Sequence, residues 1–264
     1  MITINTIVSM KKKGEKIVSL TAYDFISARI LDEAGIEIIL VGDSAANVFA
    51  GEKTTLPITM EEMLYHTRVV ARGVKNALVI ADMPFLSYQV SLETAISNAG
   101  RFLQVGACGV KLEGGKSMVE TVKKLVDLGI PVMGHLGLTP QSIHKFGGYK
   151  IQGIGEAAAA QMIEDARALQ AAGCFSVVLE KIPRTLAQKI TETLEIPTIG
   201  IGAGLYCDGQ ILVLHDLLGL YEDFTPKFVK RYGQLGEHMR RAVQDYKKEV
   251  KEGIFPDKEH SFDP

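Results

Sequence analysis

The sequence has few cysteines and no cysteine motif. Its 264 residues include only three cysteines, and no two of them form a CxxC pair. An odd, scattered set of this kind argues against a disulfide framework and against a zinc site. Cys108 and Cys174 each precede an apolar run, and we expect both side chains to pack in the core.

Net charge and long apolar runs are also lacking. The formal net charge is −2, which gives no electrostatic reason to expect binding to nucleic acid or to an anionic membrane. No run approaches the roughly 18 apolar residues of a membrane span, and residues 1–14 lack the apolar core and cleavage site of a signal peptide. We therefore predict a soluble, cytoplasmic protein with no nucleic-acid or membrane partner.

What the sequence does contain is a regular alternation of short apolar runs with longer helical patterns. Its apolar fraction of 47% and charged fraction of 23% are ordinary for a globular protein. The apolar runs predict eight strands, at residues 17–23, 36–42, 77–81, 109–113, 131–134, 175–180, 197–201 and 210–214. Helical patterns separate them, except that residues 203–209 are too few for an ordinary helix. Eight such units in about 250 residues predict an α/β fold, a (β/α)8 TIM barrel, more than a doubly wound sheet.

The parts outside the barrel pattern lie at the two ends and in two long loops. We predict a helix at the N-terminus and a long charged helix from about residue 226 to residue 253, followed by a polar tail at 254–264 that is disordered or packs as an arm on a neighbouring subunit. Residues 43–57 and 137–154 are predicted to be loops. Because no linker-like stretch divides the chain, we predict a single barrel domain over residues 1–264.

The predicted strand at residues 109–113 carries an acid and a base on one face. Successive side chains of a strand point to opposite faces, so Lys111 and Glu113 point the same way. Two glycines then end the strand, and Ser117 followed by Glu120 predicts a capping box at the start of the next helix. Lys111 and Glu113 would thus lie at the C-terminal end of a strand, where α/β barrels have their active sites. A purely structural ion pair between them is the alternative.

Polar residues end several other predicted strands in the same way. They are Asp43 and Ser44 after the second strand, Asp82 after the third, Lys111 and Glu113 on the fourth, His135 after the fifth and Glu180 at the end of the sixth. In a barrel these residues form one ring around a central pocket. The carboxylates of Asp43, Asp82 and Glu113 would repel one another unless a cation or protons intervene. Oxygen ligands without a cysteine or a histidine pair favour magnesium over zinc, although each acid alone is also compatible with a helix cap or a surface position.

These residue types suit chemistry on a 2-keto acid. Magnesium usually binds one or two protein carboxylates and keeps positions for a chelating ligand such as a 2-keto acid, whose neighbouring C–H proton then becomes removable. Glu180 is the predicted base because an apolar strand presents it, and an ion pair with Lys181 is its structural alternative. Lys111 would place positive charge at the substrate carboxylate or the enolate. His135 is a candidate for a hydrogen bond to substrate, or is structural.

Two glycine-containing segments are less specific. Residues 200–204, with three glycines, occupy the place where many barrels bind phosphate, but close backbone packing explains the glycines equally well. Residues 147–150 predict a loop tip that acts as a lid or is only a turn.

A series of ordered motifs runs from about residue 17 to residue 232. The motifs are TAYD (21–24), LVGDS (40–44), YHTR (65–68), ADMPF (81–85), KLEGG (111–115), GHLGLTPQS (134–142), GGYK (147–150), IGIGAG (199–204) and DGQILV (208–213). In these motifs the sequence resembles the ketopantoate hydroxymethyltransferase family. Two local departures, Ile154 in place of a basic residue and Ala45-Ala46-Asn47 after Asp43-Ser44, lie in long loops where they can shape access of folate.

The resemblance implies a specific reaction. A hydroxymethyl group would pass from the co-substrate 5,10-methylenetetrahydrofolate to 3-methyl-2-oxobutanoate, giving 2-dehydropantoate and tetrahydrofolate, in the first committed step of pantothenate biosynthesis. By resemblance, one Mg²⁺ per subunit is held by Asp43, Asp82 and Glu113, the last of them directly or through water. The implied substrate contacts are Asp43, Ser44, Asp82 and Lys111, and the implied proton acceptor is Glu180. A homo-oligomer, specifically a decamer, is also implied.

The residues without the resemblance leave two other interpretations open. A magnesium barrel of the phosphoenolpyruvate and isocitrate lyase kind would use the same acids on another 2-oxo acid, with a phosphate or dicarboxylate pocket. A non-catalytic barrel that binds a small acid, as a scaffold or sensor, would keep the pocket without proton transfer.

Overall fold

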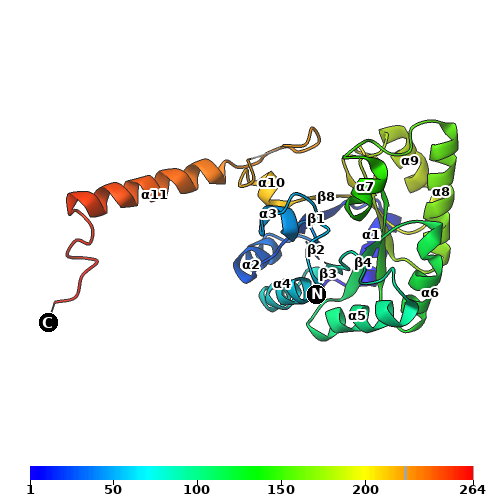
Figure 1. Cartoon of the computed structure of the whole chain (residues 1–264), viewed down its shortest axis with the longest axis horizontal. Helices are drawn as coiled ribbons and strands as arrows, with labels where there is room; N and C mark the ends of the chain where they lie inside the picture. Colours follow the sequence, from blue (N-terminus) through cyan, green and yellow to red (C-terminus); the bar gives the residue numbers. More distant parts are fainter. Residues whose placement is uncertain (223–224, 264) are drawn as a thin grey trace. The chain divides into compact units, whose positions relative to one another are not determined.

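The computed structural model describes residues 1–222 and 225–263, and it contains two compact units, Met1–Val213 and Leu214–Pro264. The first unit is a closed barrel of eight strands in sequence order, β1 to β8, with every neighbouring pair parallel and β8 paired with β1. Helices lie around the outside of these strands (Figure 1). The predicted (β/α)8 barrel is confirmed, whereas a single domain over residues 1–264 stays a prediction.

All eight strands lie at or close to the predicted apolar runs. Their bounds are β1 (Ile17–Thr21), β2 (Ile38–Val41), β3 (Leu78–Asp82), β4 (Gly109–Glu113), β5 (Val132–Gly137), β6 (Ser176–Glu180), β7 (Thr198–Ile201) and β8 (Gly209–Leu212). The prediction for β5 ended too early, so that His135 lies on this strand and not after it. No helix occupies the described residues between β7 and β8, as expected from the shortness of that link.

The helices of the barrel unit begin at side-chain caps in several cases. Their bounds are α1 (Ile4–Lys13), α2 (Phe25–Glu33), α4 (Met60–Gly73), α5 (Leu92–Gln104), α6 (Val119–Asp127), α8 (Glu156–Ala171) and α9 (Arg184–Thr193). At α4, Thr59 and Glu62 form the capping box that satisfies two free amides of the first turn. The expected capping box at Ser117 is wrong. The chain there forms a 3-10 turn, η1 (Lys116–Met118), and the Lys116 amide donates instead to Asp165 Oδ1 of α8 at 3.0 Å.

Both predicted long loops contain short helices. The first holds α3 (Ala45–Val48), in which Ala45 and Ala46 are fully buried, so the unusual alanines after Ser44 are packing residues. The second holds η2 (Pro140–Ser142) and α7 (Ile143–Phe146). Helices this short are not visible as an apolar period in the sequence.

The barrel interior is apolar at its N-terminal end. Inward-facing residues of seven strands form one cluster with side chains of α1, which therefore closes this end of the barrel; the buried members are Ile7, Met10, Ile17, Ile38, Leu40, Leu78, Ile80, Met133, Phe175, Val178, Ile199 and Ile211. Cys174 is buried as expected, but the prediction for Cys108 is wrong because its side chain is exposed. Cys108 lies in the turn before β4, and its backbone amide donates a hydrogen bond to Val79 O.

The second unit contains α10 (Leu214–Leu217) and α11 (Leu235–Glu252). The long helix ends as predicted at Gly253, which has a left-handed φ of 69°. It begins later than predicted, because the amides of Tyr232 and Leu235 donate to carbonyls of residues 217 and 218 and hold the preceding segment outside a helix. Among the described residues, no helix is long and apolar enough to cross a membrane.

Candidate active site

The inward face of the barrel changes from apolar to polar at the C-terminal ends of the strands. Because alternate residues share a face, Asp82 follows Ile80 inward on β3, and His135 follows Met133 inward on β5. Glu180 follows the same rule on β6. The strand register then places acids beside bases, since Asp82 pairs with Lys111 and Glu113 pairs with His135 across neighbouring strands.

Lys111 lies at the centre of this polar end. Its Nζ is 3.0 Å from Asp82 Oδ1 and 3.2 Å from His135 Nδ1, and its side chain is 5% exposed. Burial alone would lower the pKa of Lys111, but the negative charges of Asp82, Glu113 and Asp43 raise it well above its usual value. Lys111 is therefore a permanent buried cation that pairs with Asp82, and the simple pair with Glu113 on its own strand does not form.

Asp43 and Asp82 share a buried position between β2 and β3. The Asp43 amide donates to Asp82 Oδ2 at 3.0 Å, and both carboxylates are nearly inaccessible. Burial together with the neighbouring charges of Asp82 and Glu113 raises the pKa of Asp43 to about 8, although Lys111 opposes the shift. Burial also raises the pKa of Asp82 against the lowering effect of Lys111. The positive charge of Lys111 is therefore not enough to keep both aspartates ionised, and a further cation or a proton is needed at this position.

His135 connects the acid of β4 with the acid of β6. Its Nδ1 is 3.4 Å from Glu113 Oε1, and its Nε2 is 3.3 Å from Glu180 Oε2. Burial and Lys111 lower the pKa of His135, but the carboxylates of Glu113 and Glu180 outweigh them and raise it. Glu180 is the most accessible acid of the group, with 16% of its side chain exposed. His135 therefore holds Glu180 at the rim of the pocket.

Glu180 is followed by a residue with an unusual backbone conformation. Lys181 has a positive φ of 48°, and its Nζ contacts the carbonyl oxygen of Tyr149 in the predicted loop tip at residues 147–150. The alternative of an ion pair between Glu180 and Lys181 is therefore not seen in the described structure. Lys181 instead ties that loop to the end of β6.

Ser44 lies beside the acids at the start of α3. Its Oγ is 2.8 Å from the hydroxyl of Tyr23. A Cβ at Gly42 would lie 2.6 Å from this Oγ, so the glycine allows Ser44 to fold back over the end of β2. The structure thus places all seven predicted site residues at one end of the barrel.

The negative charge of the acidic side chains at this end of the barrel is large enough to attract a divalent cation. Four carboxylates, those of Asp43, Asp82, Glu113 and Glu180, face one lysine and one histidine. Glu113 Oε1 is buried, and its contact among the described residues is His135 Nδ1 at 3.4 Å. As the side chains stand, no three His, Cys, Asp or Glu residues of the described chain surround a common metal position. Because magnesium commonly takes only one or two protein carboxylates and keeps waters, the three-acid metal site stays a prediction.

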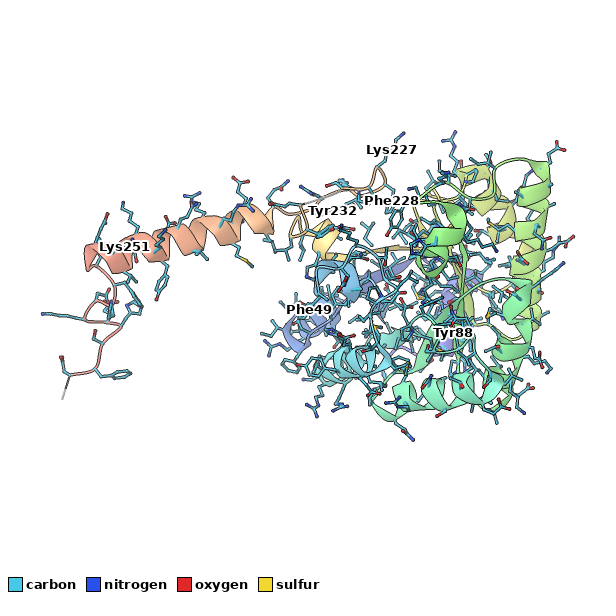
Figure 2. The ribbon with its side chains drawn as sticks, in the orientation of Figure 1. Phe49, Tyr88, Lys227, Phe228, Tyr232 and Lys251 are labelled. Carbon is cyan, nitrogen blue, oxygen red and sulfur yellow. The ribbon has the colours of Figure 1, made fainter. Side chains whose placement is uncertain are left out.

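Two site residues were not anticipated from the sequence. The Gln141 side chain donates to Asp43 Oδ2 at 3.0 Å, and its amide donates to Glu113 Oε2 at 3.0 Å. The Tyr88 hydroxyl accepts from the Glu113 amide at 3.1 Å, and the ring lies within the barrel unit (Figure 2) with 2% of its surface exposed. Gln141 lies in the three-residue 3-10 turn η2 and Tyr88 lies outside helices and strands, so no strand or helix period predicts that they reach the acids.

The glycines at residues 200–204 are explained by packing. A Cβ at Gly200 would lie 2.9 Å from Cys207 Sγ. Gly204 has a φ of +84°, and a Cβ there would lie 2.6 Å from that of Arg184. Close approach therefore accounts for Gly200 and Gly204 without a phosphate.

The comparisons with known proteins agree on one family. Residues 1–258 match the family model described as ketopantoate hydroxymethyltransferase. The chain is 60% identical over 262 residues to 3-methyl-2-oxobutanoate hydroxymethyltransferase of Syntrophus aciditrophicus, covering 99% of this chain and 96% of that one. It is also 60% identical over 260 residues to the protein of the same name from Clostridium kluyveri, covering 98% and 93%.

Among solved structures, the chain is similar to 2,3-dimethylmalate lyase, a PEP mutase/isocitrate lyase superfamily member. The TM-score is 0.63 and the sequence identity 18%, with 99% of this chain and 92% of that chain covered. At this identity the likeness shows the barrel fold alone, so it gives the lyase interpretation no support in substrate or residues. The family match over nearly the whole chain also excludes the interpretation as a non-catalytic scaffold. The chain belongs to the ketopantoate hydroxymethyltransferase family and is a one-carbon transferase that moves a hydroxymethyl group.

Proposed function

We propose that this hydroxymethyltransferase uses 3-methyl-2-oxobutanoate as acceptor and 5,10-methylenetetrahydrofolate as donor. With one water, the products are 2-dehydropantoate and tetrahydrofolate. The observation that carries the proposal is the 60% identity, over 99% of the chain, to a protein named for this acceptor. The ring of buried acids around Lys111 is the chemistry such an acceptor needs, because a keto acid must lose a carbon-bound proton before it can attack the one-carbon unit.

In this proposal one Mg²⁺ per subunit is held by Asp43, Asp82 and Glu113. The excess of buried carboxylates and the raised pKa values of both aspartates support it. When bound, the ion would supply positive charge that polarises the keto group of the substrate. Lys111 adds a fixed positive charge beside it, which favours the substrate carboxylate and the enolate form of the substrate.

Glu180 is proposed to accept the proton from C3 of the keto acid. Its position at the rim of the pocket and its contact with His135 Nε2 support this assignment. The C3 carbon of the enolate would then form a bond to the methylene carbon of the folate, and water would add its hydroxyl group to the same methylene carbon. Both bonds from that carbon to the folate nitrogens break, and the nitrogens take up the proton removed by Glu180 and the remaining proton of the water, which gives tetrahydrofolate. Asp43, Ser44, Asp82, Lys111 and His135 are the proposed substrate contacts.

Assembly of several copies is proposed from the second unit. The exposed apolar side chains of Met239, Val243, Tyr246 and Val250 follow one another at steps of four, three and four residues along α11. This spacing forms one stripe on a helix that otherwise carries charge, and such a stripe is stable in water only when it is covered. We propose a homo-oligomer, with the decamer of the family as its form, and a cytoplasmic location.

The decisive experiment is exchange of the C3 proton of 3-methyl-2-oxobutanoate in heavy water, followed by proton NMR. We expect the signal to disappear with protein and magnesium and to persist when a chelator is added. Tetrahydrofolate is added to a parallel sample, since folate can be needed to complete the site. Failure to exchange in every sample would contradict the proposed proton transfer, and faster turnover of a dicarboxylate would favour a lyase.

A further inference from the structure

The side-chain amide of Gln141 is buried and fully hydrogen-bonded. Its Nε2 donates to Met83 O at 2.9 Å and to Asp43 Oδ2 at 3.0 Å. Its Oε1 accepts from the Tyr88 hydroxyl at 2.8 Å and from Gln89 Nε2 at 3.2 Å. A primary amide has two N–H donors and one oxygen with two lone pairs. All four positions are therefore used, which leaves the group a single orientation.

The backbone fixes which end of the amide faces Asp43. Met83 O is a carbonyl and can only accept, so the nitrogen of Gln141 must face it. The second N–H of the same nitrogen then points at Asp43 Oδ2. This bond holds one oxygen of the carboxylate, Oδ2, in a fixed direction.

The same residue holds a second acid through its main chain. The Gln141 amide donates to Glu113 Oε2, whereas Glu113 Oε1 is buried and faces His135 Nδ1 at 3.4 Å. The Tyr88 hydroxyl closes the arrangement, since it accepts from the Glu113 amide and donates to Gln141 Oε1. One oxygen of each of two acids is thus bound by Gln141, while the other oxygen of each is not bound by it.

We propose that Gln141 is a positioning residue that orients Asp43 and Glu113 so that one oxygen of each is presented to a divalent cation. Its neutral amide suits this role, because it holds a carboxylate without adding a positive charge that would compete with the cation. Tyr88 supports the amide from its other side. The inference rests on the proposed function, since it assumes that the acids bind a metal.

The test is the affinity of the full-length protein for Mn²⁺, used as a probe for magnesium and measured by calorimetry without substrate. Gln141→Met keeps the length of the side chain and removes its donors. A hydrogen bond to a charged group contributes about 1.5–3 kcal/mol, so we expect Mn²⁺ to bind about tenfold or more weakly. Tyr88→Phe should weaken binding by less. Gln188→Met, which removes an amide that donates to Glu192 on the surface of α9, should leave it unchanged.

A second readout separates orientation from general damage. We expect Gln141→Met to lower the rate of C3 proton exchange at saturating keto acid. The melting temperatures of Gln141→Met and Gln188→Met are compared, because Gln188→Met shows how much the loss of one surface hydrogen bond alone changes stability. Wild-type Mn²⁺ affinity in Gln141→Met would overturn the inference even if turnover changed. If that variant does not fold, unchanged affinity in Tyr88→Phe overturns it instead. If the wild-type protein binds no Mn²⁺, the proposed metal site and this inference are both contradicted. If the wild-type protein binds Mn²⁺ but does not exchange the C3 proton, only the proposed reaction is contradicted.

Discussion

At the scale of single residues, the site depends on contacts between neighbouring strands. Lys111 and Glu113 share a face of β4, yet they do not pair with each other. The register brings Asp82 to Lys111 and His135 to Glu113 instead. Each acid of β3 and β4 therefore has a basic partner on the next strand, and His135 Nε2 also contacts the Glu180 carboxylate at 3.3 Å.

Glu180→Gln should stop proton abstraction while leaving the buried acids in place. Loss of a general base typically costs a factor of about 10²–10⁴, so we expect exchange of the C3 proton to slow at least about a hundredfold. Mn²⁺ affinity should not change, because Asp43, Asp82 and Glu113 are untouched. Exchange at the wild-type rate in heavy water would remove Glu180 as the base.

The three cysteines should differ sharply in reactivity. Burial raises the pKa of Cys174 to about 12, and burial also raises the pKa of Cys207, whereas the side chain of Cys108 is exposed. The thiolate is the reactive form, so at pH 8 an aromatic disulfide reagent should modify about one thiol per folded chain. Cys108→Ser should abolish this fast reaction, and denaturant should expose the remaining thiols. Rapid modification of Cys174 in the folded protein would contradict the buried position.

At the scale of elements, Asp32 joins α2 to the segment between α4 and β3. Its carboxylate accepts from the amides of Lys75, Asn76 and Ala77 at 3.0, 2.8 and 2.7 Å. The residue is 7% exposed. These bonds satisfy amides that neither the helix nor the strand can pair, so Asp32 fixes where the chain enters β3.

Asp32→Asn should destabilise the barrel by about 1–3 kcal/mol, because an amide N–H would face backbone donors. Burial would raise the pKa of Asp32, but the three backbone bonds outweigh it and lower the pKa below its ordinary value. A lowered folded-state pKa means that the contribution is complete above the unfolded pKa of about 3.9 and is lost as the pH falls through the folded value.

Urea unfolding of wild type and variant at pH 7 and at pH 3 measures this difference. The gap in unfolding free energy between the two proteins should be smaller at pH 3 than at pH 7. Glu33→Gln is the matched control, since Glu33 is the exposed neighbour on the same helix. A gap that is independent of pH would show that the carboxylate charge of Asp32 does not stabilise the fold.

At the scale of the whole molecule, the chain combines a barrel unit that contains all the site residues with a second unit that carries α11. The barrel positions the acids by closing β1 to β8 into a ring. The apolar stripe of α11 has no role in that ring, and assembly with further copies would explain its exposed side chains.

Val243→Lys should therefore weaken assembly. A lysine in the centre of the stripe places a charge where apolar side chains of another copy would pack. Analytical ultracentrifugation should show a shift to smaller species at micromolar protein, with an unchanged circular dichroism spectrum. Gln244→Lys introduces the same residue on another face of α11 and should keep the wild-type species. An unchanged distribution for Val243→Lys would contradict assembly through the stripe.

Local sequence patterns determined much of the fold. Eight apolar runs marked the strands, and a short link ruled out a helix between β7 and β8, because burial and alternation are properties of neighbouring residues in the chain. The same alternation identified the polar residues at the strand ends. The motifs identified the family and thereby the reaction.

Only the tertiary structure decided which of these residues meet. The Asp82–Lys111 pair depends on the register between strands that a whole helix separates. The position of Gln141 depends on a three-residue turn, and that of Tyr88 on a segment outside helices and strands, and neither segment is long enough to show a period. The expected cap at Ser117 is wrong because the chain forms a 3-10 turn over residues 116–118, and the helix begins after Met118, whose side chain makes no cap hydrogen bond. The sequence by itself determined the strands, the barrel and the set of acids, whereas closure of the barrel decided their partners, because hydrogen bonds and charges act through space and not along the chain.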